Sequence, residues 1–469
     1  MQRLSFWLIL LLATLYVSGC ATATRDKHAP VVPTPIVTPA PGIPLPPAPG
    51  EAVISVLPPS IIETSPLPPG MAPLPPADKF APHIALILPL KSATFALAAD
   101  AVQQGFLAAA NSQAHGIPVR VYTSNDESKD VIEIYRQAIA NGAVAVAGPL
   151  TRPGVTLLAG YSFIPVPTLA LNTTEQKTAS QNMYFFGLIP ETEARQVAQL
   201  AFAAKLRDAT IINTGTALSK RLSIAFADEW KKLGGNINAD VTYRDDDDTN
   251  TLFNLPTAPW LVEPDLPPPV TLVSESGEVT TVAPKRIGPP PVAPGNVVFL
   301  AADTKQARWI RPYLNPTLPV YGTSQIFNVN ADTLTNYDLS DIHFVDMPWL
   351  LEPDHPAVMI YPRSAIPLDT ERERLYAFGI DAYRLLQIML NARNNSLPLD
   401  GVTGRIQLTD TNVFQREAVP ALFKYGHGLT PEALAALEAE KAAAKAAELA
   451  ARKAATDTPA ALPAPTPAQ

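Results

Sequence analysis

The sequence predicts an α/β protein whose middle part is made of two successive units of similar size. Between residues 80 and 428, short and almost continuously apolar runs alternate with segments whose apolar residues recur at helical spacing. Such apolar runs are typical of parallel strands that helices cover on both faces. The alternation starts again near residue 188, with no long linker before it. We therefore expect two lobes and, between them, a cleft where the carboxyl ends of the strands meet.

The first lobe is expected to span approximately residues 80–187, with a later segment of the chain returning to it. Helices are predicted after the first and second strands, around Val102 and Ile134, where apolar residues repeat every three or four positions. The predicted strands are His83–Leu90, Val119–Tyr122, Ala143–Ala147 and Pro167–Leu171.

The second lobe is expected to span approximately residues 188–320, again with a later segment added. Its predicted helices cover about Glu191–Lys205, the residues around Phe226, and about Thr304–Leu314. The predicted strands are Ala209–Ile212, Ile237–Tyr243 and Val297–Leu300.

A proline-rich insertion of approximately residues 245–295 interrupts the second lobe. No ordinary loop is that long, so we expect mostly irregular chain. Val270–Val273 and Glu278–Val282, on either side of Gly277, are compatible with a small hairpin. The four aspartates Asp245–Asp248 could bind calcium, but they lack the spacing of an EF-hand loop, and a solvated charge run is the favoured interpretation.

Residues 1–19 have the features of a signal peptide, and residue 20 is the single cysteine of the chain. Arg3 precedes an apolar run, Phe6–Val17. This run is shorter than the ~20 apolar residues needed to span a bilayer. Val17–Cys20 resembles the lipobox of bacterial lipoproteins. That resemblance implies acylation of Cys20, which becomes the first residue after cleavage, and Ala21 in place of aspartate implies the outer membrane, facing the periplasm. The alternative is an ordinary signal peptide with an incidental free cysteine.

Residues 20–79 and 429–469 flank the two lobes and differ from them in composition. The N-terminal segment holds many of the 51 prolines and favours an extended polyproline II ensemble. At ~3.1 Å per residue it could reach at most roughly 180 Å, which suits a tether through the cell wall or a spacer with no required length. Thr430, Pro431 and Glu432 predict the start of an exposed, Ala-rich helix over Glu432–Ala455. Thr458–Gln469 is predicted to be a disordered tail.

Composition and missing motifs exclude several kinds of function. The formal net charge of −8 argues against a nucleic-acid binder, and one cysteine permits no disulfide framework within the chain. The six histidines include no pair at i,i+4, and no P-loop, G-x-G-x-x-G, G-x-S-x-G or Ser-x-x-Lys motif occurs. We therefore expect no metal, no cofactor and no enzyme, although an enzyme with scattered catalytic residues stays open.

From about Ala81 to His427 the chain resembles the type I periplasmic binding proteins, the leucine-binding-protein-like fold of two Rossmann-like lobes. The resemblance rests on HIALILPLKSATFALAADAVQQGFLAA, AVAGPLT, GIDAYRLLQIML and GVTGRIQLT, in that order. It implies a ligand held in the cleft after the strands. The residues at the matching positions are Lys91, Ser92, Thr151, Arg152, Asn172, Thr173, Thr216, Ser219 and Gln325. Amino-acid-binding members usually have an aromatic-Gly pair where this chain has Thr216–Ser219, which weakens the case for a free amino acid. The alternative is that these are polar loop residues without a ligand.

A narrower resemblance, to the LppC/LpoA family, rests on FVDMPWLL at residues 344–351, YGTSQ at 321–325 and LYAFGIDA at 375–382. It implies an outer-membrane lipoprotein that activates a class A penicillin-binding protein, with the outer membrane and this synthase as partners and peptidoglycan as a further candidate. The motif residues Asp346, Met347, Pro348 and Trp349 are marked by the resemblance, and a structural role, with Trp349 packed in the core, is equally compatible with it. Long members carry a helical domain of TPR type where this chain has its proline-rich tether. The alternative function is a periplasmic lipoprotein that binds an amino acid, peptide or amide.

Overall fold

The computed structural model describes residues 81–175, 180–243, 270–273, 279–282, 294–391 and 397–457. The predicted signal peptide, Cys20, the proline-rich linker, Asp245–Asp248 and Thr458–Gln469 lie outside these residues. No helix in the described ranges is both long and apolar enough to cross a membrane.

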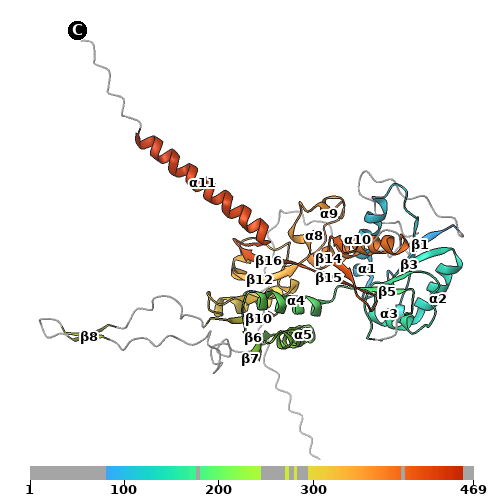
Figure 1. Cartoon of the computed structure of the whole chain (residues 1–469), viewed down its shortest axis with the longest axis horizontal. Helices are drawn as coiled ribbons and strands as arrows, with labels where there is room; N and C mark the ends of the chain where they lie inside the picture. The colour runs from blue at the N-terminus through green and yellow to red at the C-terminus, as the bar shows by residue number, and fades with distance from the viewer. Residues whose placement is uncertain are drawn as a thin grey trace, which may run out of the picture. The chain divides into compact units, whose positions relative to one another are not determined.

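The first large sheet combines strands from the beginning of the chain with three strands from near its end (Figure 1). Its order is β13-β14-β15-β5-β4-β3-β1-β2. Neighbouring strands from β15 to β2 run parallel, whereas β13, β14 and β15 pair antiparallel. The strands are β1 (His83–Leu88), β2 (Val119–Thr123), β3 (Ala143–Ala147), β4 (Thr168–Ala170), β5 (Met183–Phe186), β13 (Leu399–Gly401), β14 (Gly404–Leu408) and β15 (Val413–Glu417).

The second large sheet has the order β17-β16-β12-β11-β10-β6-β7. Its strands β12, β11, β10, β6 and β7 are parallel, and β16 and β17 add an antiparallel edge. The strands are β6 (Asp208–Asn213), β7 (Asn236–Thr242), β10 (Asn296–Ala301), β11 (Val320–Tyr321), β12 (Ile342–Asp346), β16 (Val419–Lys424) and β17 (His427–Leu429).

Helices cover both faces of the first sheet, as the continuous apolar strands predict. In β1, Leu86 packs with α1 (Ala96–Asn111) and α10 (Thr370–Leu390), while Ile87 packs on the other face with α2 (Glu127–Ala140) and α3 (Arg152–Ala159). Since successive strand residues point to opposite faces, a strand covered on both sides must be apolar throughout.

The second sheet is covered in the same way. On one face, Phe299 of β10 packs with α4 (Pro190–Ala203) and α5 (Ala217–Leu233). On the other, Leu300 packs with α7 (Thr304–Ile310) and the residues around it. The remaining short elements are η1 (Arg311–Tyr313), η2 (Ser324–Ile326), η3 (Thr335–Leu339), α8 (Pro348–Leu351) and α9 (Pro356–Met359).

Two features outside the sheets match the sequence. The strands β8 (Val270–Val273) and β9 (Val279–Val282) pair antiparallel, which confirms the hairpin in the insertion. The helix α11 (Pro431–Asp457) follows Thr430, whose hydroxyl accepts a hydrogen bond from the backbone N–H of Ala433. The side chains of α11 that the structure describes are exposed or half-buried.

Two stretches that suggested the fold meet at one buried carboxylate. Asp381 of α10 accepts hydrogen bonds from the backbone N–H groups of Val402 and Thr403 and from the Thr403 hydroxyl. A side chain at Gly401 would come within 2.5 Å of this carboxylate, so the tight turn before β14 requires glycine there. The helix GIDAYRLLQIML and the strand GVTGRIQLT are therefore held together directly.

The described chain passes between the two large sheets three times. It leaves the first sheet after β5, returns after β12 and leaves again after β15, where Ala418 alone separates β15 from β16. The site described next lies at these three crossovers.

Candidate functional site at the junction of the two lobes

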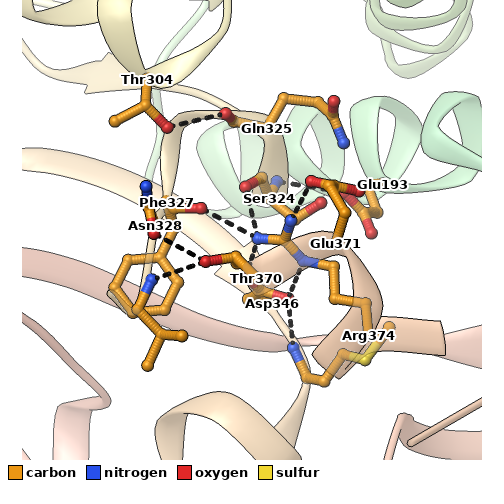
Figure 2. Close-up of polar contacts among 12 residues, drawn as sticks. Glu193, Thr304, Ser324, Gln325, Phe327, Asn328, Asp346, Thr370, Glu371 and Arg374 are labelled. Atoms are coloured by element: carbon orange, nitrogen blue, oxygen red, sulfur yellow. Dashed lines mark hydrogen bonds and ion pairs between the residues drawn. The ribbon is translucent and has the colours of Figure 1, made fainter. Parts of the chain in front are cut away.

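A buried ion pair joins α10 of the first lobe to the second sheet (Figure 2). The guanidinium of Arg374 donates to both carboxylate oxygens of Asp346, from Nη2 to Oδ2 at 2.6 Å and from Nε to Oδ1 at 3.2 Å. Asp346 is the last residue of β12 and is 0% exposed, while Arg374 is 4% exposed. The pair therefore sits at the second crossover.

Arg374 makes three further hydrogen bonds. Nη2 donates to the backbone oxygens of Ser324 at 2.9 Å and Phe327 at 3.1 Å, and Nη1 donates to Glu371 at 2.5 Å. A buried ion pair is tolerated when the geometry is bidentate and the other hydrogen-bonding groups are occupied. Burial alone would lower the pKa of Arg374. The charge and hydrogen bonds of Asp346, together with the charges of Glu371 and Glu193, outweigh burial, and the pKa lies above its ordinary value.

A second buried ion pair also joins the two lobes. Arg416, in β15 of the first sheet, contacts Glu193, in the first turn of α4 in the second lobe, and both are nearly inaccessible to solvent. The other carboxylate oxygen of Glu193 accepts the backbone N–H of Ser324 at 3.1 Å. Ser324 thus connects the two ion pairs, since its carbonyl oxygen receives Arg374 (Figure 2).

The third crossover is held by an amide side chain. Gln196 of α4 donates to the carbonyl oxygen of Ala418 at 2.7 Å and accepts the N–H of the same residue at 3.0 Å. A cavity of about 260 Å³ lies beside it, lined by residues that include Gly187, Gln196, Phe414 and Ala418. Polar side chains therefore hold the second and third crossovers directly, and the ion pair of Glu193 holds the start of α4, which follows the first.

Three of the predicted cleft residues, Thr151, Thr216 and Ser219, bond to backbone groups through their hydroxyls. Thr151 and Thr216 cap α3 and α5, accepting the N–H groups of Gly154 and Ser219. The Ser219 hydroxyl bridges two backbone segments, donating to Ala301 O at 2.5 Å and accepting Thr214 N at 2.8 Å. These hydroxyls stabilise the backbone at the starts of α3 and α5, as expected if they are polar loop residues that bind no ligand.

The remaining predicted residues differ in their bonding and exposure. The Ser92 hydroxyl accepts two backbone N–H groups, each at 3.4 Å. The Asn172 side chain donates to Leu150 O and accepts the N–H of Thr173. Lys91 and Arg152 are exposed, and Gln325 is half-buried. The cavity beside Gln196 is lined by none of the nine predicted residues.

A carboxylate of the chain itself occupies the turn after β3. Glu127, 1% exposed, accepts the backbone N–H of Leu150 at 3.1 Å and that of Thr151 at 2.6 Å. Burial raises the pKa of Glu127, and the hydrogen bonds from Thr151 and Leu150 oppose that shift. The backbone N–H groups of Leu150 and Thr151, beside the predicted ligand residues Thr151 and Arg152, are thus already used by Glu127.

The motif around Asp346 is part of the core. Trp349 is 0% exposed, its Nε1 donates to Glu373 at 2.7 Å, and the guanidinium of Arg363 lies 3.8 Å from its ring centroid. Met347 and Pro348 are buried beside it, with Pro348 at the first position of α8. These four motif residues therefore have structural contacts that account for their positions.

Glu193, Arg374 and Arg416 were not singled out from the sequence. One signal was available for Arg374, because helical spacing places it with Thr370, Ala377 and Asp381 on the buried side of α10. No comparable signal marks the strand residue Arg416. Within the described residues, no group of three or more His, Cys, Asp or Glu side chains is placed to hold a metal ion.

Comparison with known proteins gives one family and two kinds of neighbour. The family model described as "LppC putative lipoprotein" matches residues 78–255 and 293–428. A protein of Edwardsiella ictaluri named "Penicillin-binding protein activator LpoA" is 29% identical over 323 residues, covering 66% of this chain and 45% of that protein. The chain thus spans about half the length of the curated relatives it matches.

Two solved structures share the fold. A Chromobacterium violaceum protein described as a "putative branched-chain amino acid ABC transporter" is 34% identical with a TM-score of 0.57, covering 73% of this chain and 99% of that one. The LpoA C-domain from Haemophilus influenzae is 19% identical with a TM-score of 0.54, covering 74% of this chain and 99% of that domain. The predicted two-lobed fold of type I periplasmic binding proteins is confirmed.

Proposed function

Because the chain belongs to the LppC lipoprotein family, we propose that it is a lipid-anchored regulator of peptidoglycan synthesis. In this proposal Cys20 carries the lipid, the outer membrane holds it, and the two-lobed domain faces the periplasm. The partner is a class A penicillin-binding protein, whose synthase activity the domain raises. The chain itself catalyses no reaction.

The observation that carries the proposal is the family match across both lobes. The residues matched by the family model include nearly all of those that form the two large sheets. Curated relatives that cover 66% and 71% of this chain are named penicillin-binding protein activators. The Haemophilus influenzae C-domain is described as a regulator of PBP1A. Since the family model matches residues of both lobes, the proposal assigns the synthase contact to the two-lobed part.

The lobe junction supports a binding role in which the domain acts as a preformed surface. An activator must bind the active conformation of its target more tightly than the inactive one, and a tenfold preference corresponds to about 1.4 kcal/mol. A surface that is already ordered loses less conformational entropy on binding. The ion pairs Arg374–Asp346 and Arg416–Glu193 supply such order by tying the lobes together.

A synthase assay tests the proposal. The lipid-free chain, residues 21–469, would be added to a purified class A penicillin-binding protein while glycan polymerisation is followed, and a pull-down would measure binding. We expect a severalfold faster rate that saturates with the binding curve. Heat-denatured protein at the same concentration is the control. An unchanged rate at saturation with several class A synthases would contradict the proposal.

A second candidate, a small-molecule receptor, is favoured by the 34% identity to the Chromobacterium violaceum protein. It predicts stabilisation by a ligand according to RT ln(1 + [L]/Kd), about 2.7 kcal/mol at a hundredfold excess over Kd. Glu127 and the helix caps weigh against a ligand with a free carboxylate in the turn after β3, because they already use the donors there. A thermal-shift screen with amino acids, amides and short peptides separates the two candidates.

Membrane attachment is tested separately through Cys20. We expect the full chain to fractionate with outer membranes and the Cys20→Ser variant to be retained in the soluble or inner-membrane fraction. The two proteins have the same domain, so a difference reports on the anchor alone. Equal fractionation of both would contradict lipidation at this residue.

A further inference from the structure

An aromatic groove lies on the first lobe, away from the crossovers. It has a volume of about 300 Å³ and is lined by residues of α2, the end of α3 and the chain that follows α3. Phe163 is 76% exposed and Tyr161 is 41% exposed, although both have large apolar rings. The lining residues are Ile132, Tyr135, Arg136, Ile139, Ala140, Leu158, Tyr161, Phe163, Ile164 and Pro165.

We propose that the proline-rich segment Ser65–Pro76 of the same chain binds in this groove as a polyproline II helix. The segment reads SPLPPGMAPLPP and contains Pro-Leu-Pro-Pro twice, at residues 66–69 and 73–76. With three residues per turn, prolines at i and i+3 lie along one edge of a polyproline II helix. Grooves lined by aromatic residues are the usual receptors for such edges.

The polar groups at the groove fit this kind of ligand. A polyproline II backbone makes no internal hydrogen bonds, so its carbonyl oxygens need donors. Arg136 and Tyr161 are both exposed at the groove and carry donors. The hydroxyl of Tyr135, by contrast, is buried and bonded to Thr168 at 2.9 Å, so its ring contributes only an apolar wall.

The place where the described chain begins brings the segment to the groove. His83 at the start of β1 donates its backbone N–H to Gly142 O at 3.4 Å. The Nε2 atom of its ring lies 3.0 Å from the Tyr122 hydroxyl, which also accepts a hydrogen bond from the side-chain amide of Asn141. Asn141 and Gly142 directly follow Ala140, the last residue of α2 and part of the groove. The linker therefore joins the domain at one end of the groove.

The lengths agree with binding within one chain. From Pro76 to Ala81 an extended chain covers about 15 Å at ~3.1 Å per residue. The wall formed by α2 from Ile132 to Ala140 is about 12 Å long at ~1.5 Å per residue. The second Pro-Leu-Pro-Pro can thus reach the groove without a detour, and a covalently linked ligand profits from a high effective concentration. Binding would attach the last part of the linker to the domain and so shorten the tether.

Photocrosslinking in the lipid-free chain, residues 21–469, tests this proposal. The photoreactive residue p-benzoylphenylalanine would replace Phe163, which is exposed enough that the change should not disturb folding. Cleavage after acidic residues releases residues 64–78, bounded by Glu63 and Asp78, for mass spectrometry. We expect the main crosslink to fall on this fragment, with a yield that does not depend on protein concentration.

Two variants complete the experiment. Replacing the prolines at 66, 68, 69, 73, 75 and 76 by serine should lower the yield at least fivefold, since it removes the polyproline II edge but not the chain. The same probe at Trp309, an exposed residue of the second lobe, should leave the fragment unlabelled. Crosslinks to other segments, a yield that rises with concentration as for a second copy, or an unchanged yield in the serine variant would overturn the proposal. The outcome is independent of synthase activation.

Discussion

The crossovers between the lobes and the ends of the parallel strands use polar residues in opposite ways. At the crossovers, Arg374, Asp346, Glu193 and Arg416 are buried charges that bond one lobe to the other. At the strand ends, the side chains of Thr151, Asn172 and Thr216 each bond within their own lobe. The first arrangement fixes the relation of the lobes, and the second fixes local backbone.

This difference bears directly on function. A receptor that closes around a ligand needs polar groups that are free to contact it and lobes that can rotate. The described residues provide few such groups after β3 and β4, and their side-chain contacts hold the second and third crossovers and the start of α4. The contrast therefore favours a domain that acts through its outer surface. It can be tested by substitutions at the crossovers and by substitutions at the strand ends.

The largest expected effect is that of removing Arg374, which is buried against Asp346. Arg374→Met should lower the free energy of unfolding by about 3–5 kcal/mol, because it leaves a buried carboxylate without its partner. Denaturant unfolding of the lipid-free chain measures this. The matched control is Arg372→Met, two residues earlier on α10, whose partner Asp369 is exposed. Loss of that surface pair should cost at most about 1 kcal/mol.

A second variant shows whether the buried charge itself is responsible. Adding Asp346→Leu to Arg374→Met removes the unpaired carboxylate and should recover a large part of the loss. If Arg374→Met costs no more than Arg372→Met, the ion pair does not stabilise the junction.

The next effect is the coupling between Glu193 and Arg416, whose side chains are both buried. A double-mutant cycle with Glu193→Gln and Arg416→Met should give a coupling energy towards the upper end of the usual range, which is about 0.5–3 kcal/mol for residues in contact. The control pair Glu191–Arg221 starts from the same turn of α4, and its arginine is exposed. Its coupling energy should stay at or below about 1 kcal/mol, as is usual for surface pairs. Equal coupling energies in the two pairs would show that the crossover pair is no stronger than a surface pair.

Much of the fold could be predicted from local sequence pattern, because a strand that is buried on both faces appears in the sequence as a continuous apolar run. A strand such as β1 is apolar almost throughout because it is buried on both faces, and the predicted strands at Ala143 and Val297 recur in the structure for the same reason. The predicted strand at Val119 also recurs, although it is a half-buried edge strand that contains Arg120. The strands β5, β11, β12, β13 and β15 and the antiparallel edge β16–β17 were not predicted. They have few residues or alternate in burial, so their sequences differ little from loops.

The junction could not be predicted in the same way, because its partners lie far apart in the sequence. Arg416 and Glu193 are brought together only by the path of the chain across two lobes. The strand-end residues were correctly placed on turns, since Thr151 and Thr216 precede helices. Whether such hydroxyls cap the helix or contact a ligand depends on packing that sequence spacing does not reveal.

A smaller effect is expected at Glu127, and it depends on pH. Because burial raises its pKa in the folded state above the ordinary 4.5, the folded chain binds more protons than the unfolded chain in that range. The stability that Glu127 contributes is therefore present below its ordinary pKa and is lost as the pH rises through the folded pKa. Relative to Glu127→Gln, the natural chain should lose about 1.4 kcal/mol for each unit by which the pKa is raised.

Unfolding curves of both proteins between pH 4 and 8 measure this difference. Glu133→Gln, an exposed glutamate on the same helix, controls for the loss of a negative charge. A stability difference between the natural chain and Glu127→Gln that grows in favour of the natural chain with rising pH would reverse the sign and contradict the assignment.

The smallest effect is expected at Lys91 and Arg152, the two exposed cations that the resemblance placed beside a ligand. Substitution of either by alanine should change the free energy of unfolding by no more than about 0.5 kcal/mol, as is usual for surface positions. If the strand ends bind no ligand, the two variants should also activate a class A synthase as well as the natural chain does.

The same two variants also separate the regulator from the receptor. A ligand that stabilises the natural chain and fails to stabilise Lys91→Ala or Arg152→Ala would make the strand ends a binding site. The crossovers would then act as the hinge of a receptor whose strand ends bind the ligand. Since a single thermal-shift series covers both variants, the smallest effect on stability is also the one that decides most sharply between the two functions.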